Sequence, residues 1–127
     1  MSTYGTAGEA LVDLFQSGNF HLHSGTSSNF KIDCDALTDA DIQTVAMLLK
    51  ERLPDFGNVE GVPRGGLRLA GAMRRYVTSG PVLIVDDVWT TGGSIWKVRG
   101  NREDVIGAVI FARGDTQSWV TALFRMR

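Results

Sequence analysis

The stretch VLIVDDVWTTGGS, residues 82–94, is the part of the chain that best indicates its fold. Its first four residues, Val82–Val85, are apolar and predict a strand buried on both faces of a sheet. Two adjacent carboxylates, Asp86 and Asp87, follow where this strand is expected to leave the sheet. The turn Thr90–Ser94 then offers hydroxyls, backbone N–H groups and the start of a helix, all of which suit a phosphate. Because carboxylates bind neighbouring hydroxyls, the stretch indicates a ligand with both a sugar diol and a phosphate.

Strand and helix patterns alternate along the chain. Thr38 and Asp41 form a capping pair at the start of a helix that ends before Pro54. Further helices are expected at residues 9–17, 67–76 and 94–99, and strands near 58–61, 82–85, 105–111 and 119–124. This alternation predicts an α/β fold with a central, mainly parallel sheet flanked by helices. Ligands of such sheets bind beyond the carboxyl ends of the strands, where the acid pair is expected.

Composition narrows the class of protein. The 127 residues are enough for one domain, with 43% hydrophobic and 21% charged residues. The net charge of −1 and the lack of a basic block argue against a nucleic-acid partner. No apolar run is long enough for a membrane span, and the first residues lack the pattern of a secretory signal. Cys34 is the single cysteine, expected as a small buried residue in a reduced compartment, so a cytoplasmic location is predicted.

A second glycine-rich loop, Gly61–Gly66, also follows a predicted strand and opens a predicted helix. Glycines let backbone N–H groups approach an anion closely, and the guanidinium of Arg64 adds a fork of donors. Alone, the pattern fits a plain strand-to-helix turn as well as it fits an anion site. Its position some twenty residues before the acid pair favours the anion site.

Residues 82–94 resemble the phosphoribosyl pyrophosphate (PRPP) signature of the type I phosphoribosyltransferases at all thirteen positions. The resemblance implies that Asp86 and Asp87 bind the ribose hydroxyls and, with Arg64, form the catalytic set. It implies that the 5′-phosphate is bound by the loop residues Thr90, Thr91, Gly92, Gly93 and Ser94. It also implies that the pyrophosphate is bound by Val62, Pro63, Arg64 and Gly65, with Mg²⁺ held mainly through PRPP itself.

The segment 18–33 resembles the N-terminal signature of orotate phosphoribosyltransferases, through Phe20, Leu22, Ser24, Gly25, Ser28, Phe30 and Asp33. In that family it forms a hood over the pyrimidine, which implies a small hood segment at about residues 18–36 and a PRPP-binding core at about 58–124. The base-binding residues implied are Phe20, His23, Ser24, Phe30 and Arg113. Without the resemblance, the segment reads as a polar hairpin whose His21 and His23 could bind a metal, although no third ligand is evident.

Two departures from the family keep alternatives open. His23 stands where orotate enzymes commonly carry a lysine, which favours a different base. Only Val77–Pro81 separates the predicted helix from the PRPP strand, where the family carries a long mobile lid. A missing lid would weaken water exclusion and favours a non-catalytic PRPP-binding or nucleotide-binding module. A response-regulator-like domain fits poorly, because its acids would come near the start of the chain.

The sequence as a whole predicts an orotate-type phosphoribosyltransferase that uses PRPP and a pyrimidine base. Catalysis would rest on positioning and electrostatics, with no protein nucleophile. A homodimer is implied by the resemblance, and it would also bury Trp89, Trp96 and Trp119 if these side chains are exposed. Burial of each tryptophan inside the core is the alternative.

Overall fold

The computed structural model describes residues 34–126. Contacts divide the chain into two units, residues 1–44 and 45–127. The helix predicted at residues 9–17 and the hood segment up to Asp33 lie outside the described residues. In the first unit, a 3₁₀ turn, η2 (Cys34–Ala36), precedes helix α2 (Asp39–Arg52), which begins in this unit and ends in the second. Cys34 is only half-buried, so the expectation of a buried thiol is wrong.

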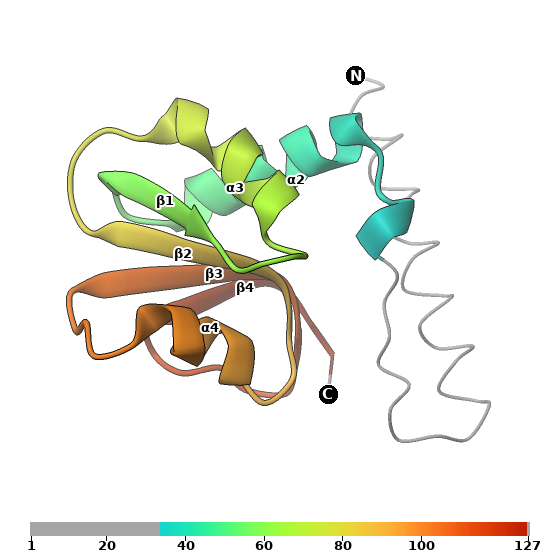
Figure 1. Ribbon diagram of the computed structural model, residues 1–127. Coiled ribbons are helices and arrows are strands. Elements are labelled where there is room, and N and C mark those ends of the chain that lie inside the picture. The colour runs from blue at the N-terminus through green and yellow to red at the C-terminus, as the bar shows by residue number, and fades with distance from the viewer. Residues whose placement is uncertain (1–33, 127) are drawn as a thin grey trace, which may run out of the picture. The chain divides into compact units, whose positions relative to one another are not determined.

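The second unit is built on a four-stranded sheet in which every neighbouring pair of strands is parallel (Figure 1). The strands lie side by side in chain order: β1 (Asn58–Gly61), β2 (Val82–Trp89), β3 (Val105–Arg113) and β4 (Val120–Met126). Helix α3 (Leu67–Met73), extended by the 3₁₀ turn η3 (Arg74–Tyr76), and helix α4 (Gly93–Arg99) lie on opposite faces of the sheet in Figure 1. The predicted α/β architecture is confirmed.

The capping pair at the start of α2 forms as predicted. The backbone N–H of Asp41 donates to Thr38 Oγ1 at 3.1 Å, and the N–H of Thr38 donates to Asp41 Oδ2 at 2.9 Å. These reciprocal bonds satisfy two backbone donors that the helix cannot satisfy itself. At the other end of α2, in the second unit, Arg52 donates to the carbonyl of Leu123 in β4 at 3.0 Å.

Burial on both faces explains why β2 reads as an uninterrupted apolar run. Leu83, Ile84 and Val85 are all fully buried, although successive side chains point to opposite faces of a strand. On the face covered by α4, Gly107 of β3 leaves room for larger neighbours. A Cβ at Gly107 would lie 3.0 Å from the Trp119 ring and 3.2 Å from Ile95, so glycine permits close packing there.

The structure corrects one expectation about the acid pair. Asp86 and Asp87 do not follow the strand but lie inside β2, which continues to Trp89. The last pairing between β1 and β2 joins Gly61 to Val85, whereas β2 and β3 remain paired as far as Trp89 and Ala112. Pairing with the longer strand β3 therefore carries β2 past the acids. Because β1 has already ended, the acids have a paired strand on one side only.

The short link Val77–Pro81 lies at the amino end of β2. It is tied there by hydrogen bonds from Gly57 N to the carbonyl of Pro81 and from Thr78 N to the carbonyl of Phe56, both 2.9 Å. Five extended residues reach about 17 Å, whereas the eight residues of β2 span about 26 Å. This link therefore cannot cover the carboxyl end of the sheet.

The tryptophans give little support to a homodimer. Trp89 is only 5% exposed, and Trp119 is half-buried. Trp96 is 39% exposed and makes an edge contact with Trp119 at 5.4 Å between ring centroids. The alternative of burial is therefore confirmed for Trp89 and wrong for Trp96, and a homodimer remains a prediction. None of the described helices is both long and apolar enough to cross a membrane.

Candidate functional site

Parallel strands place all their carboxyl ends at one edge of the sheet, and the acid pair lies toward that edge of β2. The side chain of Asp86 is buried, with 7% of the residue exposed, and that of Asp87 is half-buried. Asp86 Oδ1 accepts the N–H of Asp87 and Asp87 Oδ1 accepts the N–H of Val88, each at 2.8 Å. One oxygen of each carboxyl thus accepts a backbone N–H, which holds both side chains in place.

The pKa of Asp86 lies well above the ordinary value of an aspartate. Burial raises the pKa of Asp86 to about 7, and the neighbouring carboxyl of Asp87 raises it further by hydrogen bonding and charge repulsion. The backbone N–H of Asp87 acts in the opposite direction, because it stabilises the anion. A carboxyl with a pKa near neutrality can hold or release a proton under physiological conditions, which is uncommon for a purely structural aspartate.

The turn after β2 packs against the side chain of Trp89. Gly92 lies at the start of α4 with a φ of +85°, a left-handed conformation that favours glycine. A Cβ at this position would also lie 2.7 Å from Cζ2 of the Trp89 ring, so the turn packs directly against the indole. A pocket of about 250 Å³ opens beside this turn, and it is lined by Asp86, Val88, Trp89, Thr90, Thr91, Gly92, Gly93, Ser94, Ile95 and Lys97.

This pocket joins the two features that the sequence places in one stretch. All five residues of the predicted phosphate loop line it, together with the first carboxylate of the pair. Drug-sized ligands occupy pockets of about 300–1,000 Å³. The smaller pocket here suits a sugar phosphate rather than an entire nucleotide.

The loop Val62–Gly66 lies on the other side of the acid pair. It is tied to β2 by a 2.8 Å hydrogen bond from Val62 N to the carbonyl of Val85, and closed by a 2.7 Å bond from Gly66 N to the carbonyl of Val62. A Cβ at Gly65 would lie 2.6 Å from Cγ of Asp87. The backbone of this loop therefore touches the second carboxylate, and the peptide bond from Pro63 to Arg64 is cis. The side chain of Arg64 is exposed at the tip.

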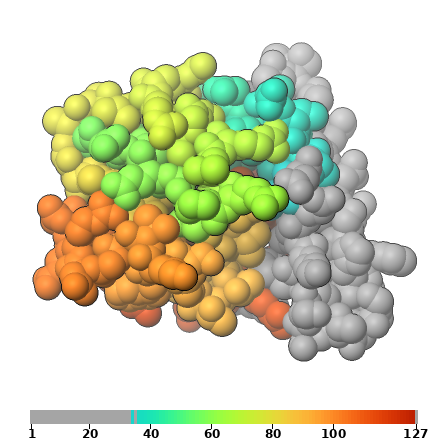
Figure 2. Space-filling view, in the orientation of Figure 1, coloured from blue at the N-terminus to red at the C-terminus, as the bar shows by residue number. Residues whose placement is uncertain are grey.

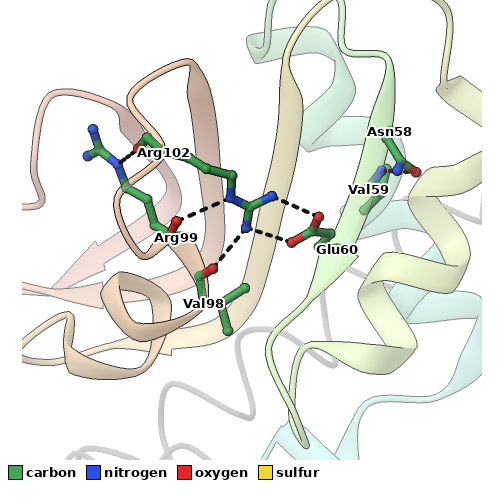
Figure 3. Close-up of polar contacts among 6 residues, drawn as sticks. All are labelled: Asn58, Val59, Glu60, Val98, Arg99 and Arg102. Carbon is green, nitrogen blue, oxygen red and sulfur yellow. Dashed lines mark hydrogen bonds and ion pairs between the residues drawn. The ribbon is translucent and has the colours of Figure 1, made fainter.

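An ion pair ties together the two elements that carry these loops (Figure 3). Arg102, which follows α4, donates two hydrogen bonds of 2.9 and 2.8 Å to Glu60 of β1. The same guanidinium donates to the carbonyls of Val98 and Arg99 at the end of α4, at 2.8 and 3.2 Å. Hydrogen bonding to Arg102 lowers the pKa of Glu60, although partial burial opposes the shift. Figure 2 shows the β1 segment and the segment after α4 meeting on one face of the molecule.

Of the predicted base-binding residues, Arg113 alone belongs to the described part of the chain. Arg113 is exposed at the end of β3, at the same edge of the sheet as the acid pair. Phe20, His23, Ser24 and Phe30, as well as the metal-site alternative with His21, lie outside the described residues. Within the described part of the chain, no group of three or more His, Cys, Asp or Glu side chains could hold a metal ion.

Sequence reasoning missed Lys97, which lines the pocket from α4. A signal for it existed, because residues three or four positions apart share one face of a helix. Lys97 follows Gly93 by four residues and Ser94 by three, so it shares a helix face with the end of the phosphate loop.

Comparisons with known proteins do not assign this chain to a family. No family model matches the chain, and no curated protein matches it. Among solved structures, it is similar to the Helicobacter pylori xanthine-guanine-hypoxanthine phosphoribosyltransferase, with 15% sequence identity. The match covers 65% of this chain and 84% of that chain, with a TM-score of 0.44. At this level the similarity says nothing about what this chain binds.

Proposed function

We propose that this chain binds PRPP and transfers its phosphoribosyl group to a nucleobase. The observation that supports this most is the position of the acid pair between two loops. Asp86 lines the pocket of the Thr90–Ser94 loop, and Asp87 touches Gly65 of the other loop. PRPP has the matching order of groups, with a ribose diol between a 5′-phosphate and a 1-pyrophosphate.

Each part of the site then has a defined role. The carboxyls of Asp86 and Asp87 accept the ribose hydroxyls, and the Thr90–Ser94 loop binds the 5′-phosphate. The loop Val62–Gly66 and the exposed guanidinium of Arg64 bind the pyrophosphate. As the C1–O bond breaks, its electron pair leaves with the pyrophosphate, whose growing charge Arg64 stabilises. A nitrogen of the base forms the new bond to C1, and no side chain becomes covalently attached.

The described residues fit a magnesium ion that is held largely by the substrate. Mg²⁺ prefers oxygen ligands, keeps several waters and is commonly bound by one or two carboxylates with substrate phosphates. Asp86 and Asp87 can supply such carboxylates, and no larger acidic cluster occurs in residues 34–126. When bound, the ion would neutralise charge on the pyrophosphate.

The base is proposed to be orotate, on the resemblance of residues 18–33 alone. His23 keeps a different base open as an alternative, because orotate enzymes commonly carry a lysine there. The assay that separates these alternatives measures pyrophosphate release from PRPP and Mg²⁺ with orotate, uracil, hypoxanthine or adenine. Turnover with orotate alone supports the proposal, and turnover with another base changes the assignment.

A second candidate function is a PRPP-binding module without catalysis. The link Val77–Pro81 favours it, because this segment is tied to the amino end of β2 and cannot serve as a lid. Water would then reach the site more freely than in an enzyme with a closing loop. Tight PRPP binding without turnover on any base would establish this second function.

The site itself is tested by calorimetric titration with PRPP and Mg²⁺. The double variant Asp86→Asn/Asp87→Asn should bind at least 100-fold more weakly, because amides replace both carboxyls that are proposed to accept the ribose hydroxyls. Asp55→Asn is the matched control, since Asp55 is exposed and precedes β1, away from the carboxyl edge. Unchanged affinity of the double variant would remove the acid pair from the site.

Arg64 is tested by comparing two ligands. Arg64→Ala should weaken PRPP much more than ribose 5-phosphate, because only PRPP carries the pyrophosphate. Arg74→Ala is the control, since Arg74 is exposed on η3. Equal losses for both ligands would take Arg64 out of the pyrophosphate site.

A further inference from the structure

The pocket beside the acid pair has opposite charges in its lining. Asp86 supplies a carboxyl from β2, and Lys97 supplies an ammonium from α4. Lys97 is the only lysine or arginine among the described residues that line this pocket. Three hydroxyl-bearing residues, Thr90, Thr91 and Ser94, share the lining with these two charges. A ligand with a hydroxyl-rich part and an anionic part matches this distribution.

The position of Lys97 on its helix directs it toward the loop. Side chains on an α-helix lean toward the helix N-terminus, over the preceding turn. For Lys97 the preceding turn is the end of the phosphate loop, Gly93 and Ser94. The residue is exposed, and no carboxylate within the described part of the chain forms an ion pair with it. Its flexible stem can therefore place the ammonium over the loop without breaking an existing ion pair.

Hydroxyl groups and backbone N–H groups bind phosphate oxygens but do not neutralise their charge. A phosphate monoester carries a charge of about −1.5 to −2 at pH 7, and a lysine ammonium acts on it as a compact point charge. In the described residues, the pocket offers no other cation for this purpose. The nearby carboxyl of Asp86 makes a positive charge at the phosphate end more important.

We infer that Lys97 is the charged contact of the 5′-phosphate and determines preference for a phosphorylated pentose over a free one. This inference rests on the proposed function, because it takes the pocket as the site of the sugar phosphate. Lys97 then determines specificity for the phosphorylated pentose. Other parts of the site bind the pyrophosphate and the base.

The test compares Lys97→Met with Lys97→Arg and with the control Lys50→Met. Lys50 is an exposed lysine in the last turn of α2 and does not line the pocket. Calorimetric titrations use ribose 5-phosphate, ribose, inorganic phosphate and PRPP with Mg²⁺, each at low and at high salt. Thermal unfolding of each variant shows whether the fold is kept.

Lys97→Met should weaken ribose 5-phosphate at least 10-fold and reduce the salt dependence of its binding, because one charge contact is lost. Affinity for ribose should stay unchanged. Lys97→Arg should retain most of the affinity, and Lys50→Met should behave like the original chain. A general loss of packing would instead weaken ribose and ribose 5-phosphate together, and that result would overturn the inference.

The remaining outcomes separate this inference from the proposed function. Equal affinity of Lys97→Met and the original chain for ribose 5-phosphate overturns the role of Lys97, while PRPP turnover would still support the proposed function. If the original chain binds inorganic phosphate through Lys97 but does not bind PRPP, the proposed function fails and the phosphate contact stands. If the original chain binds none of the phosphorylated ligands, both fail.

Discussion

The contact between Gly65 and Asp87 allows a specific test of the proposed PRPP site. A Cβ at Gly65 would lie 2.6 Å from Asp87 Cγ and 2.7 Å from Oδ1, where ordinary van der Waals contacts begin at 3.4 Å. The carboxyl cannot turn away freely, because Oδ1 already accepts the N–H of Val88 at 2.8 Å. The φ of Gly65 is not positive, so the backbone itself would accept alanine. Any effect of Gly65→Ala therefore reports this one contact.

The expected size follows from that geometry. The loop or the carboxyl must retreat by roughly 1 Å to restore optimal separation, and overpacking of this kind costs about 1–3 kcal/mol. Gly65→Ala should therefore lower the free energy of unfolding by about 1–3 kcal/mol. It should also weaken PRPP in calorimetric titration with Mg²⁺, because the displaced Asp87 carboxyl no longer meets the ribose hydroxyls in its original position.

Two companion variants complete the experiment. Gly71→Ala is the control, because a Cβ at Gly71 meets no atom within 4 Å and the residue lies inside α3. It should stabilise the protein by about 0.8–1 kcal/mol and leave PRPP affinity unchanged. In a double-mutant cycle, Asp87→Ala should remove most of the destabilisation caused by Gly65→Ala. If Gly65→Ala matched the original chain in both stability and PRPP affinity, the contact would be refuted.

Three further predictions concern the surrounding structure. The pKa of Asp86 is raised from 3.8 to about 7, so the folded state keeps a proton that the unfolded chain has released. Stability should therefore fall as the pH rises from about 4 to about 7. Asp86→Asn should flatten this fall and raise the Tm at pH 8, by roughly 4 °C for each kcal/mol recovered. A steeper fall in the variant would contradict the assignment. Gly107→Ala should displace the Trp119 ring and change the tryptophan fluorescence spectrum, because its Cβ would lie 3.0 Å from that ring. An unchanged spectrum would show that the packing is looser than described. The pKa of Glu60 is lowered by Arg102, so this pair stabilises the fold above pH 4.5 and loses that effect as the pH falls through the lowered pKa. Glu60→Gln should therefore lower the Tm modestly at pH 7 and low salt, with no difference in strong acid, and a difference that persists in strong acid would point to packing instead of charge.

The acid pair shows which structural features a local sequence pattern predicts and which it does not. Val82–Val85 predicts a fully buried strand, and the following acids and turn predict a site at its carboxyl end, because alternation and turn chemistry are local properties. The exact end of the strand was not predictable. β2 continues to Trp89 because β3 is long enough to keep pairing with it, and pairing between distant segments leaves no mark in the sequence of one strand.

Trp89 shows the same difference, between what a local pattern predicts and what the tertiary structure decides, for a side chain. An aromatic residue next to a phosphate loop was equally compatible with an exposed ring and with a buried one. The ring is buried because Gly92, in its left-handed conformation, packs against it. Such a contact depends on how the turn closes, which only the assembled structure decides.

The sequence by itself determined the capping of α2 and the two glycine-rich loops, since each depends on residues close together in the chain. The alternation of strands and helices along the chain determined the α/β class and the parallel direction of the strands. Tertiary structure alone decided that Gly65 touches Asp87, that Lys97 shares a pocket with Asp86, and that Arg102 ties α4 to Glu60 of β1. These contacts join elements separated in the chain, and they form only when the sheet and its two helices pack together. The physical reason is that the hydrophobic pattern specifies which face of an element is buried, whereas the meeting of particular side chains depends on the register and packing of the whole fold.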